Sequence, residues 1–478
     1  MSAPHGAANH AIAALASIEG RISLAAIAVA ACLGHLVALG GPQALAPFMA
    51  VMAVGTIALR PHLGAYLYLA LTPLIVGVPR GALIPIVRPN EALLALILAA
   101  LATRALVVLA RGERCQLPWD RNDAALILLA TFGSIVPLLL RYGRGLPVSI
   151  DDLLYAMVFW KYYLVYRVFR TSVSTPRQIA ACLWVAMASA AFVALIAILQ
   201  VLDLFGVPAF LAAHYDDPFA GSGDTASGRG TSTIASSFGV ADVMAMSLAM
   251  VLAWLPGARR RRPILLGAGL LFVAGGVVSG QVSGLIGLVV AVLTVGFVTG
   301  RLTRIIAGTV PAACILALLF WTVIAERLKG FDEPAGLPSS WVGRLDNLKR
   351  FIWPELTSGL NWIIGVRPAA RLPAPEPWRD WVFIESGYVW LIWTGGLPLL
   401  IAFLVVAWFA FWDLRRMIRT PVDPGGVAAC AGVAGLATIA TLMLLDPHLT
   451  MRGGADLFFP LLALGLLARP PASPRSPS

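Results

Sequence analysis

The sequence predicts an all-α protein that crosses a membrane many times, with about 12–14 transmembrane helices and a large external loop before the last three. Of the 478 residues, 59% are hydrophobic and only 12% are charged, whereas soluble proteins carry about 25% charged residues. Apolar runs of roughly 18 residues recur along the chain, and each is long enough to cross a bilayer as a helix. The runs lack the two-residue alternation of a lipid-facing β-barrel, so helices must satisfy the backbone within the lipid.

Each expected helix is an apolar run bounded by polar, glycine or proline residues. The stretch 263–299 is too long for one crossing, and the turn signal Ser279–Gly284 divides it. The expected helices are 22–39, 44–59, 63–78, 91–110, 123–140, 152–169, 179–203, 236–255, 263–279, 282–299, 305–325, 383–411, 427–445 and 454–468.

Arginine residues predict the orientation. With the N-terminus in the cytoplasm, the cytoplasmic loops hold 17 arginines and the short loops on the other side hold six, which is the bias of the positive-inside rule. The run Arg259–Arg262 is the strongest anchor. We therefore expect a multi-pass protein of the bacterial inner membrane with both termini in the cytoplasm. The same bias explains the net charge of +11, so nucleic acid is not an expected partner.

This topology places two long loops outside, from Phe205 to about Ile234 and from Ala325 to about Val382. In the second loop, apolar residues from Trp341 to Leu356 recur at helical spacing. They predict an amphipathic helix that lies on the outer membrane surface or packs on the bundle.

Several features in a fixed order resemble the bacterial O-antigen ligase and polysaccharide polymerase superfamily. They are Gly228–Thr233 before a helix that begins Ser236-Ser237-Phe238-Gly239; the helix pair split at Ser279–Gly284; and, from the large loop onward, Arg344, Gly365-Val366, Glu385–Tyr388 and Gly395-Gly396. The resemblance covers roughly residues 220 to 468. It divides the chain into N-terminal transmembrane helices (1–220), a ligase/polymerase-like region (221–468, with the periplasmic loop 326–382) and a disordered cytoplasmic tail (469–478).

The chain departs from the superfamily at two of these features. Gln281 stands where members often carry an arginine, and Glu385 stands where the ligases carry a histidine. The second departure favours a polymerase over a ligase. The resemblance thus implies an inverting, metal-independent glycosyltransferase that polymerises polyprenyl-diphosphate-linked oligosaccharide repeats into an exopolysaccharide or O-antigen at the periplasmic face. It needs no cofactor, and a chain-length regulator is a possible partner.

Such a reaction needs cations to hold the diphosphate. Arginine suits this task because its planar guanidinium binds phosphate oxygens in pairs. Arg229 lies a few residues before a helix start, where phosphate is favoured, but it could be an ordinary loop residue. Arg344 could instead be a headgroup anchor. We expect Arg229 and Arg344 to meet across one cavity, with weaker candidates at Arg350, Arg367 and Arg452.

The reaction also needs a base for the attacking hydroxyl. Glu385 lies where the large loop re-enters the membrane, although a carboxylate there could simply cap the helix. His448, in a short external loop, is the second candidate because histidine titrates near neutral pH.

Lys161 lies in the middle of an expected helix. A charge at that depth indicates either a function, here diphosphate contact, or a structural ion pair.

The sequence is also compatible with two other functions. One is an O-antigen ligase that transfers glycan to lipid A-core. The other belongs to a different class: a flippase for lipid-linked glycans or another membrane transporter. The sequence shows no clear duplication of the kind that many carriers have, and its external arginines and tryptophans gather on one side.

Overall fold

The computed structural model describes residues 45–114, 118–216, 228–322, 325, 339–374, 381–418 and 423–467. It confirms the fold class. Within these ranges, nine helices are long and apolar enough to cross a membrane, and three shorter apolar helices accompany them. The expected first helix, 22–39, and the tail, 469–478, lie outside the described residues.

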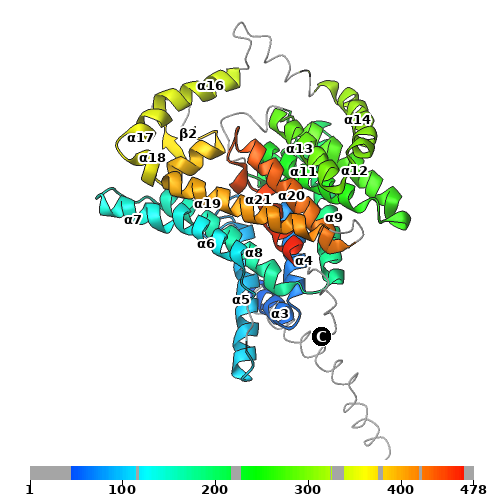
Figure 1. Cartoon of the computed structure of the whole chain (residues 1–478), viewed down its shortest axis with the longest axis horizontal. Helices are drawn as coiled ribbons and strands as arrows, with labels where there is room; N and C mark the ends of the chain where they lie inside the picture. The colour runs from blue at the N-terminus through cyan, green and yellow to red at the C-terminus, as the bar shows by residue number, and fades with distance from the viewer. Residues whose placement is uncertain are drawn as a thin grey trace, which may run out of the picture. The chain divides into compact units, whose positions relative to one another are not determined.

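The helices and strands are drawn in Figure 1. In chain order they are α3 (Leu45–Leu59), α4 (His62–Ile75), α5 (Pro89–Ala110), α6 (Arg121–Gly133), α7 (Ile135–Gly143), α8 (Ile150–Ser172), α9 (Pro176–Val201), α10 (Val207–His214), η2 (Ser232–Ile234), α11 (Ser237–Trp254), η3 (Arg259–Arg261), α12 (Arg262–Val278), α13 (Val282–Thr299), α14 (Leu302–Leu319), α16 (Ser339–Asn347), η5 (Leu348–Ile352), α17 (Trp353–Thr357), α18 (Asn361–Ile364), β1 (Arg371–Pro373), β2 (Trp381–Phe383), α19 (Gly387–Met417), α20 (Pro424–Leu442), η6 (His448–Thr450) and α21 (Gly454–Leu466).

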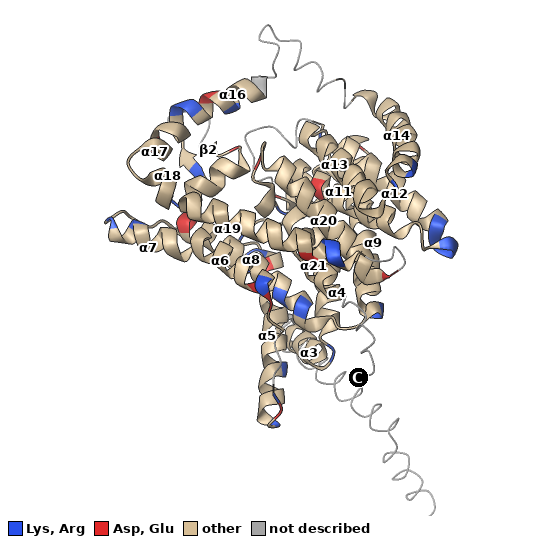
Figure 2. Ribbon diagram, in the orientation of Figure 1, with Lys and Arg blue, Asp and Glu red and all other residues tan. Residues whose placement is uncertain are grey.

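The observed spans agree closely with the apolar runs of the sequence. The expected helix 282–299 is observed with the same ends as α13. One expected span, 123–140, is interrupted at Ser134, so that α6 and α7 are separate helices. In Figure 2, the charged residues occupy short stretches, and most of the length of the helices carries no charge. This pattern is what a bundle in lipid requires, since only lipid or other helices can cover so much apolar surface.

The chain forms two compact units. The first contains α3 and the part of α5 from Leu96 onward; the second contains residues 61–95 and everything described from Arg114 on. At the centre of the second unit is α11, which is buried along its whole length and packs against α9, α12, α13, α20 and α21. The residues of the candidate site described in the structure all belong to the second unit.

The connecting segments of this unit gather at two ends. At one end, hereafter the His448 end, lie the described parts of the segments after α4, α7, α9, α12 and α20, together with residues 339–374 and 381–386. Examples of their contacts are Gly77 N–H to Thr233 O, Gly230 N–H to Val278 O and Arg344 to Asp446. At the other, the Arg121 end, Arg121 contacts Asp413, Arg170 contacts Asp120 and Gln178 contacts His62. This grouping follows the alternation that the arginine pattern predicts. Which end faces the cytoplasm stays a prediction.

The described part of the large loop packs into the bundle through a break in α19. Gly395 and Gly396 have non-helical backbone angles inside this helix. The backbone N–H of Val366 donates to the carbonyl of Trp393 at 2.7 Å across the break. A side chain on Gly365, which has φ of +85°, would come within 2.7 Å of the Thr394 carbonyl. Glycine at these positions therefore lets α18 approach α19 closely.

The predicted amphipathic helix exists, but it is not regular. It is built of α16, the π-helical turn η5 and α17. Ile352 and Leu356, near its end, are buried, whereas Trp341 and Leu345, near its start, are exposed. Only the second half of the apolar stripe is therefore covered by protein.

Candidate active site

A fully buried histidine–aspartate pair lies at the His448 end. Asp242, on α11, and His448, in η6, both have 0% exposed side chains. The Nδ1 atom of His448 lies 2.8 Å and 2.9 Å from the two carboxylate oxygens of Asp242. Charges are buried this deeply only when they are paired, so we take Nδ1 as the protonated nitrogen that donates to Asp242.

The pairing fixes what the other ring nitrogen can do. Within the described residues, Nε2 of His448 is buried and has no hydrogen-bond partner. With the proton on Nδ1, Nε2 presents a lone pair and can accept a proton. Burial alone would lower the pKa of His448, but the negative charge of Asp242 and its hydrogen bond raise it above the ordinary 6.5.

The backbone around the pair explains how it is held. A side chain on Gly454, at the start of α21, would lie 2.7 Å from a carboxylate oxygen of Asp242. Glycine there lets the backbone of α21 approach the carboxylate. The ring of Phe238, one turn before Asp242, meets His448 edge to face at 6.1 Å. The α11 helix and the loop after α20 are thus locked together at this point.

Arg344 joins the large loop to the same loop after α20. Its Nε lies 2.9 Å from Oε2 of Glu385, and its Nη1 lies 3.2 Å from Oδ2 of Asp446. The same Nη1 donates to the carbonyl of Leu445 at 3.2 Å. Burial raises the pKa of Asp446 to about 6, against the opposing influence of Arg344. The backbone carbonyl of Asp446 accepts the backbone N–H of His448 at 2.8 Å, so the arginine anchors the segment that carries the histidine.

The structure therefore brings three predicted residues together: Arg344, Glu385 and His448. It also changes their relation. Glu385 pairs with Arg344, whereas His448 has an oriented ring in which one nitrogen has no hydrogen-bond partner among the residues that the structure describes. Of the two predicted bases, the geometry favours His448.

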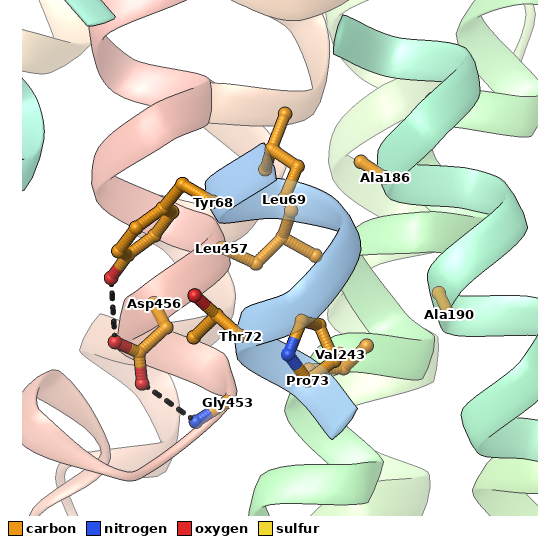
Figure 3. Close-up of a pocket in the computed structure, with 10 residues that line it drawn as sticks. All are labelled: Tyr68, Leu69, Thr72, Pro73, Ala186, Ala190, Val243, Gly453, Asp456 and Leu457. Atoms are coloured by element: carbon orange, nitrogen blue, oxygen red, sulfur yellow. Dashed lines mark hydrogen bonds between the residues drawn. The ribbon is translucent and has the colours of Figure 1, made fainter. Parts of the chain in front are cut away.

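Lys161 forms an ion pair inside the bundle. Its Nζ lies 3.0 Å from Oδ1 of Asp456, which also accepts from the hydroxyl of Tyr68 at 2.8 Å. The other carboxylate oxygen accepts from the backbone N–H of Gly453 at 3.1 Å. Figure 3 shows Asp456 and Tyr68 beside a small, mostly apolar cavity between α4, α9, α11 and α21. The cavity is about the size of one water molecule, so no sugar fits there, and the structure favours the ion-pair interpretation of Lys161.

Two arginines of the large loop also have structural partners. Arg367 donates from Nε to Asp152 at 2.9 Å and from Nη2 to Ser149 at 3.0 Å. Arg350 pairs with Asp346 one turn earlier at 2.8 Å, and both side chains are largely exposed. Arg367 fastens the loop to the start of α8, and Arg350 stabilises its own helix.

Arg229 and Arg452 lie in segments at the His448 end. Next to Arg229, the N–H of Gly230 donates to the Val278 carbonyl at 2.9 Å. Arg452 donates to the backbone carbonyl of Asp216 at 3.3 Å. The clamp shared by Arg229 and Arg344 stays a prediction.

Sequence reasoning missed Asp242. The sequence did contain an indication of it, because Asp242 is the only charged residue in the expected helix 236–255. A charge at that depth indicates a function or an ion pair. Among the described residues, the structure has no group of three or more histidine, cysteine, aspartate or glutamate side chains that could hold a metal ion.

No protein-family model matches the chain, and no curated protein matches it either.

Proposed function

We propose that this protein is a membrane glycosyltransferase that polymerises oligosaccharide repeats carried on a polyprenyl diphosphate. The observation that carries the proposal is the His448–Asp242 pair, in which Nδ1 is bound and Nε2 is without a partner within the described residues. A glycosyl transfer to a hydroxyl needs such a base, and a histidine whose second nitrogen is bound by a carboxylate is oriented for that role.

The proposed reaction proceeds in one displacement. Nε2 of His448 accepts the proton of the acceptor hydroxyl as its oxygen attacks the anomeric carbon of the donor glycan. The bond between that carbon and the phosphate oxygen breaks, and the polyprenyl diphosphate leaves with the bonding electrons. Attack from the face opposite the leaving group inverts the anomeric centre. Asp242 stabilises the imidazolium that forms.

Arg344 has a positioning role in this scheme. Its guanidinium is already shared by Glu385 and Asp446, so little of its charge is left for a diphosphate. Its contacts instead hold the large loop against the segment that carries His448. The diphosphate must then be held mainly by other cations.

The test is polymer formation by the purified full-length protein in proteoliposomes that contain lipid-linked repeat units. The wild type should produce a ladder of polymer lengths, and His448→Gln should abolish it. His214→Gln is the matched control, because His214 is an exposed histidine on α10 that contacts the carbonyl and the ring of Phe210 in its own helix. A wild type without a ladder, or a His448→Gln variant that matches it, would overturn the proposal. Transfer of a single glycan to lipid A-core would instead identify a ligase.

A further inference from the structure

Arg88, directly before α5, is a half-buried cation whose Nε has no hydrogen-bond partner in the described part of the chain. The carboxylate of Glu91, three residues along the chain, is used by other groups: it accepts from Nη2 of Arg80 at 2.9 Å and from the backbone N–H of Arg88 at 3.0 Å. Burial and the positive charge of Arg80 lower the pKa of Arg88, while Glu91 and Asp216 oppose them. Two arginines thus share one close carboxylate, and burial of a charge so weakly paired is costly.

Asn90, two residues further on, is a second unsatisfied polar group. Its side chain is 1% exposed. Both its amide nitrogen and its amide oxygen are without hydrogen-bond partners among the described residues. A buried amide in this state costs roughly 1–3 kcal/mol per unsatisfied group, and such groups need an explanation. A donor amide and a guanidinium so close along the chain can both donate to an anion.

The loop that carries His448 also lies close to the segment that precedes α5. The hydroxyl of Tyr162, on α8, donates to the carbonyl of Thr450 at 3.4 Å. Arg452 donates to the backbone carbonyl of Asp216 at 3.3 Å, and the N–H of Asp216 donates to the carbonyl of Gly77 at 2.8 Å. Gly77 lies in the segment between α4 and α5, which ends at Arg88. Arg452 is therefore held against the segment that leads to Arg88.

We infer that Arg88, Asn90 and Arg452 form a phosphate-binding site at the His448 end. It takes a phosphate or diphosphate group, whose oxygens accept from the guanidinium Nε of Arg88 and from the amide of Asn90. This inference rests on the proposed function for the identity of the ligand: the site would hold the diphosphate of the lipid-linked donor. Arg452 lies four residues after His448, so the base and the phosphate contact would be carried by one short loop.

The two possible roles of Arg88 and Asn90 predict different stabilities for the ligand-free variants. If Arg88 and Asn90 existed for packing, their replacement would destabilise the protein. If they serve an anion, their replacement by apolar residues of similar size removes unpaired polar groups, which is neutral or stabilising. The substitutions Arg88→Met and Asn90→Leu therefore separate the two roles.

The test is thermal unfolding of the full-length protein in nanodiscs of phosphatidylcholine, with inorganic pyrophosphate as the probe. Pyrophosphate should raise the Tm of the wild type, because a ligand that binds only the folded state stabilises it. Arg88→Met and Asn90→Leu should lose this rise, and their Tm without pyrophosphate should equal or exceed that of the wild type. Arg144→Gln is the control: it is an exposed arginine that donates to Asn361 at 3.1 Å, and it should keep the full response.

An equal pyrophosphate response in wild type and Arg88→Met would overturn the site, and so would no response in the wild type. A second arm uses nanodiscs that contain phosphatidylglycerol. If that lipid, rather than pyrophosphate, produces a rise in Tm that depends on Arg88, the site binds a bilayer headgroup and the link to the glycan donor is wrong. Polymer formation separates the two proposals: if pyrophosphate binds through Arg88 but the wild type makes no polymer, the phosphate site stands and the proposed function fails.

Discussion

The two ends of the bundle use the same side chains in different ways. At the Arg121 end, three arginines each contact a carboxylate: Arg121 with Asp413, Arg167 with Asp123 at 2.8 Å, and Arg170 with Asp120 at 2.7 Å. At the His448 end, Arg367 and Arg371 have such partners. However, Nε of Arg88, both polar atoms of Asn90 and Nε2 of His448 have none among the described residues. At the Arg121 end, Nε of Arg170 and the hydroxyl of Ser172 also lack partners there, but Arg170 keeps its carboxylate partner through Nη2.

The difference separates structural pairs from a candidate site. A buried pair that satisfies both partners fastens helices together, and loss of either partner leaves an uncompensated charge. A buried side chain whose polar atoms have no partner adds no stabilising hydrogen bond and calls for an explanation, such as a catalytic role or a bound ion. The contrast implies that loss of the ion pairs at the Arg121 end should change stability, whereas substitution of His448 or of its partner Asp242 should change activity.

The largest expected effect is that of Asp242→Asn. The amide can donate to Nδ1 of His448 and so force the proton onto Nε2, which is the wrong tautomer for a base. We expect the transfer rate to fall on the order of 10³-fold or more, as for comparable aspartate–histidine pairs, measured as polymer formed per folded protein in proteoliposomes. Asp413→Asn removes a carboxylate at the Arg121 end and should leave the rate per folded protein unchanged. Similar transfer rates for Asp242→Asn and Asp413→Asn would contradict the separate roles of the two ends.

Asp123→Asn should give the largest loss of stability. Asp123 is fully buried, pairs with Arg167 and accepts the backbone N–H of Asp120 in a capping box. Its neutralisation leaves the Arg167 cation without its partner, at a cost of about 3–5 kcal/mol. We expect a lower Tm in detergent and less protein in the membrane, with an unchanged transfer rate for the protein that remains folded. If activity per folded molecule falls with stability, the two ends do not have separate roles.

Activity and stability should respond to pH in opposite directions between about pH 5 and 8. His448 can accept a proton only when it is neutral, so transfer should rise with pH through its raised pKa, above 6.5. A histidine whose pKa is raised by folding stabilises the protein below 6.5, and this contribution is lost as the pH rises through the folded pKa. Asp446, raised from 3.8 to about 6, likewise favours the folded state in its protonated form, an effect lost as the pH rises from about 4 to 6.

We therefore expect the Tm to fall while the transfer rate climbs, as measured by parallel pH series. In the double variant His448→Gln, Asp446→Asn, the Tm should vary less across the same range. For Asp242→Asn, the rise in residual activity should move to lower pH, because burial alone lowers the pKa of His448. A Tm that rises with pH in the wild type would contradict the assignment of these two groups.

The smallest expected effect is that of Arg371→Gln. Arg371 pairs with Asp151 and stacks on the ring of Trp381 at 4.0 Å, and about a quarter of each side chain in the ion pair is exposed. Partly exposed pairs contribute about 1 kcal/mol or less. We expect a small decrease in Tm, within about 1 kcal/mol of the wild-type stability, that shrinks at high salt. A large loss would show that the hairpin of β1 and β2 holds the large loop in place.

The sequence by itself determined the helical fold and most of the helix ends. The expected span 427–445 became α20 (Pro424–Leu442), and 236–255 became α11 (Ser237–Trp254). Helix positions can be predicted locally because each membrane crossing needs a continuous apolar run whose backbone hydrogen bonds are formed within the helix. The alternation of arginine-rich and arginine-poor segments likewise matches the two ends that the contacts define.

Only the tertiary structure decided which polar residues act together. Asp242 and His448 are 206 residues apart, and no local pattern joins them. The partner of Lys161 proved to be Asp456, and Glu385, a predicted base, proved to be bound by Arg344. The physical reason is that hydropathy is a property of neighbouring residues, whereas the pairing of buried charges depends on which helix faces meet. That contact is made by packing between distant segments of the chain.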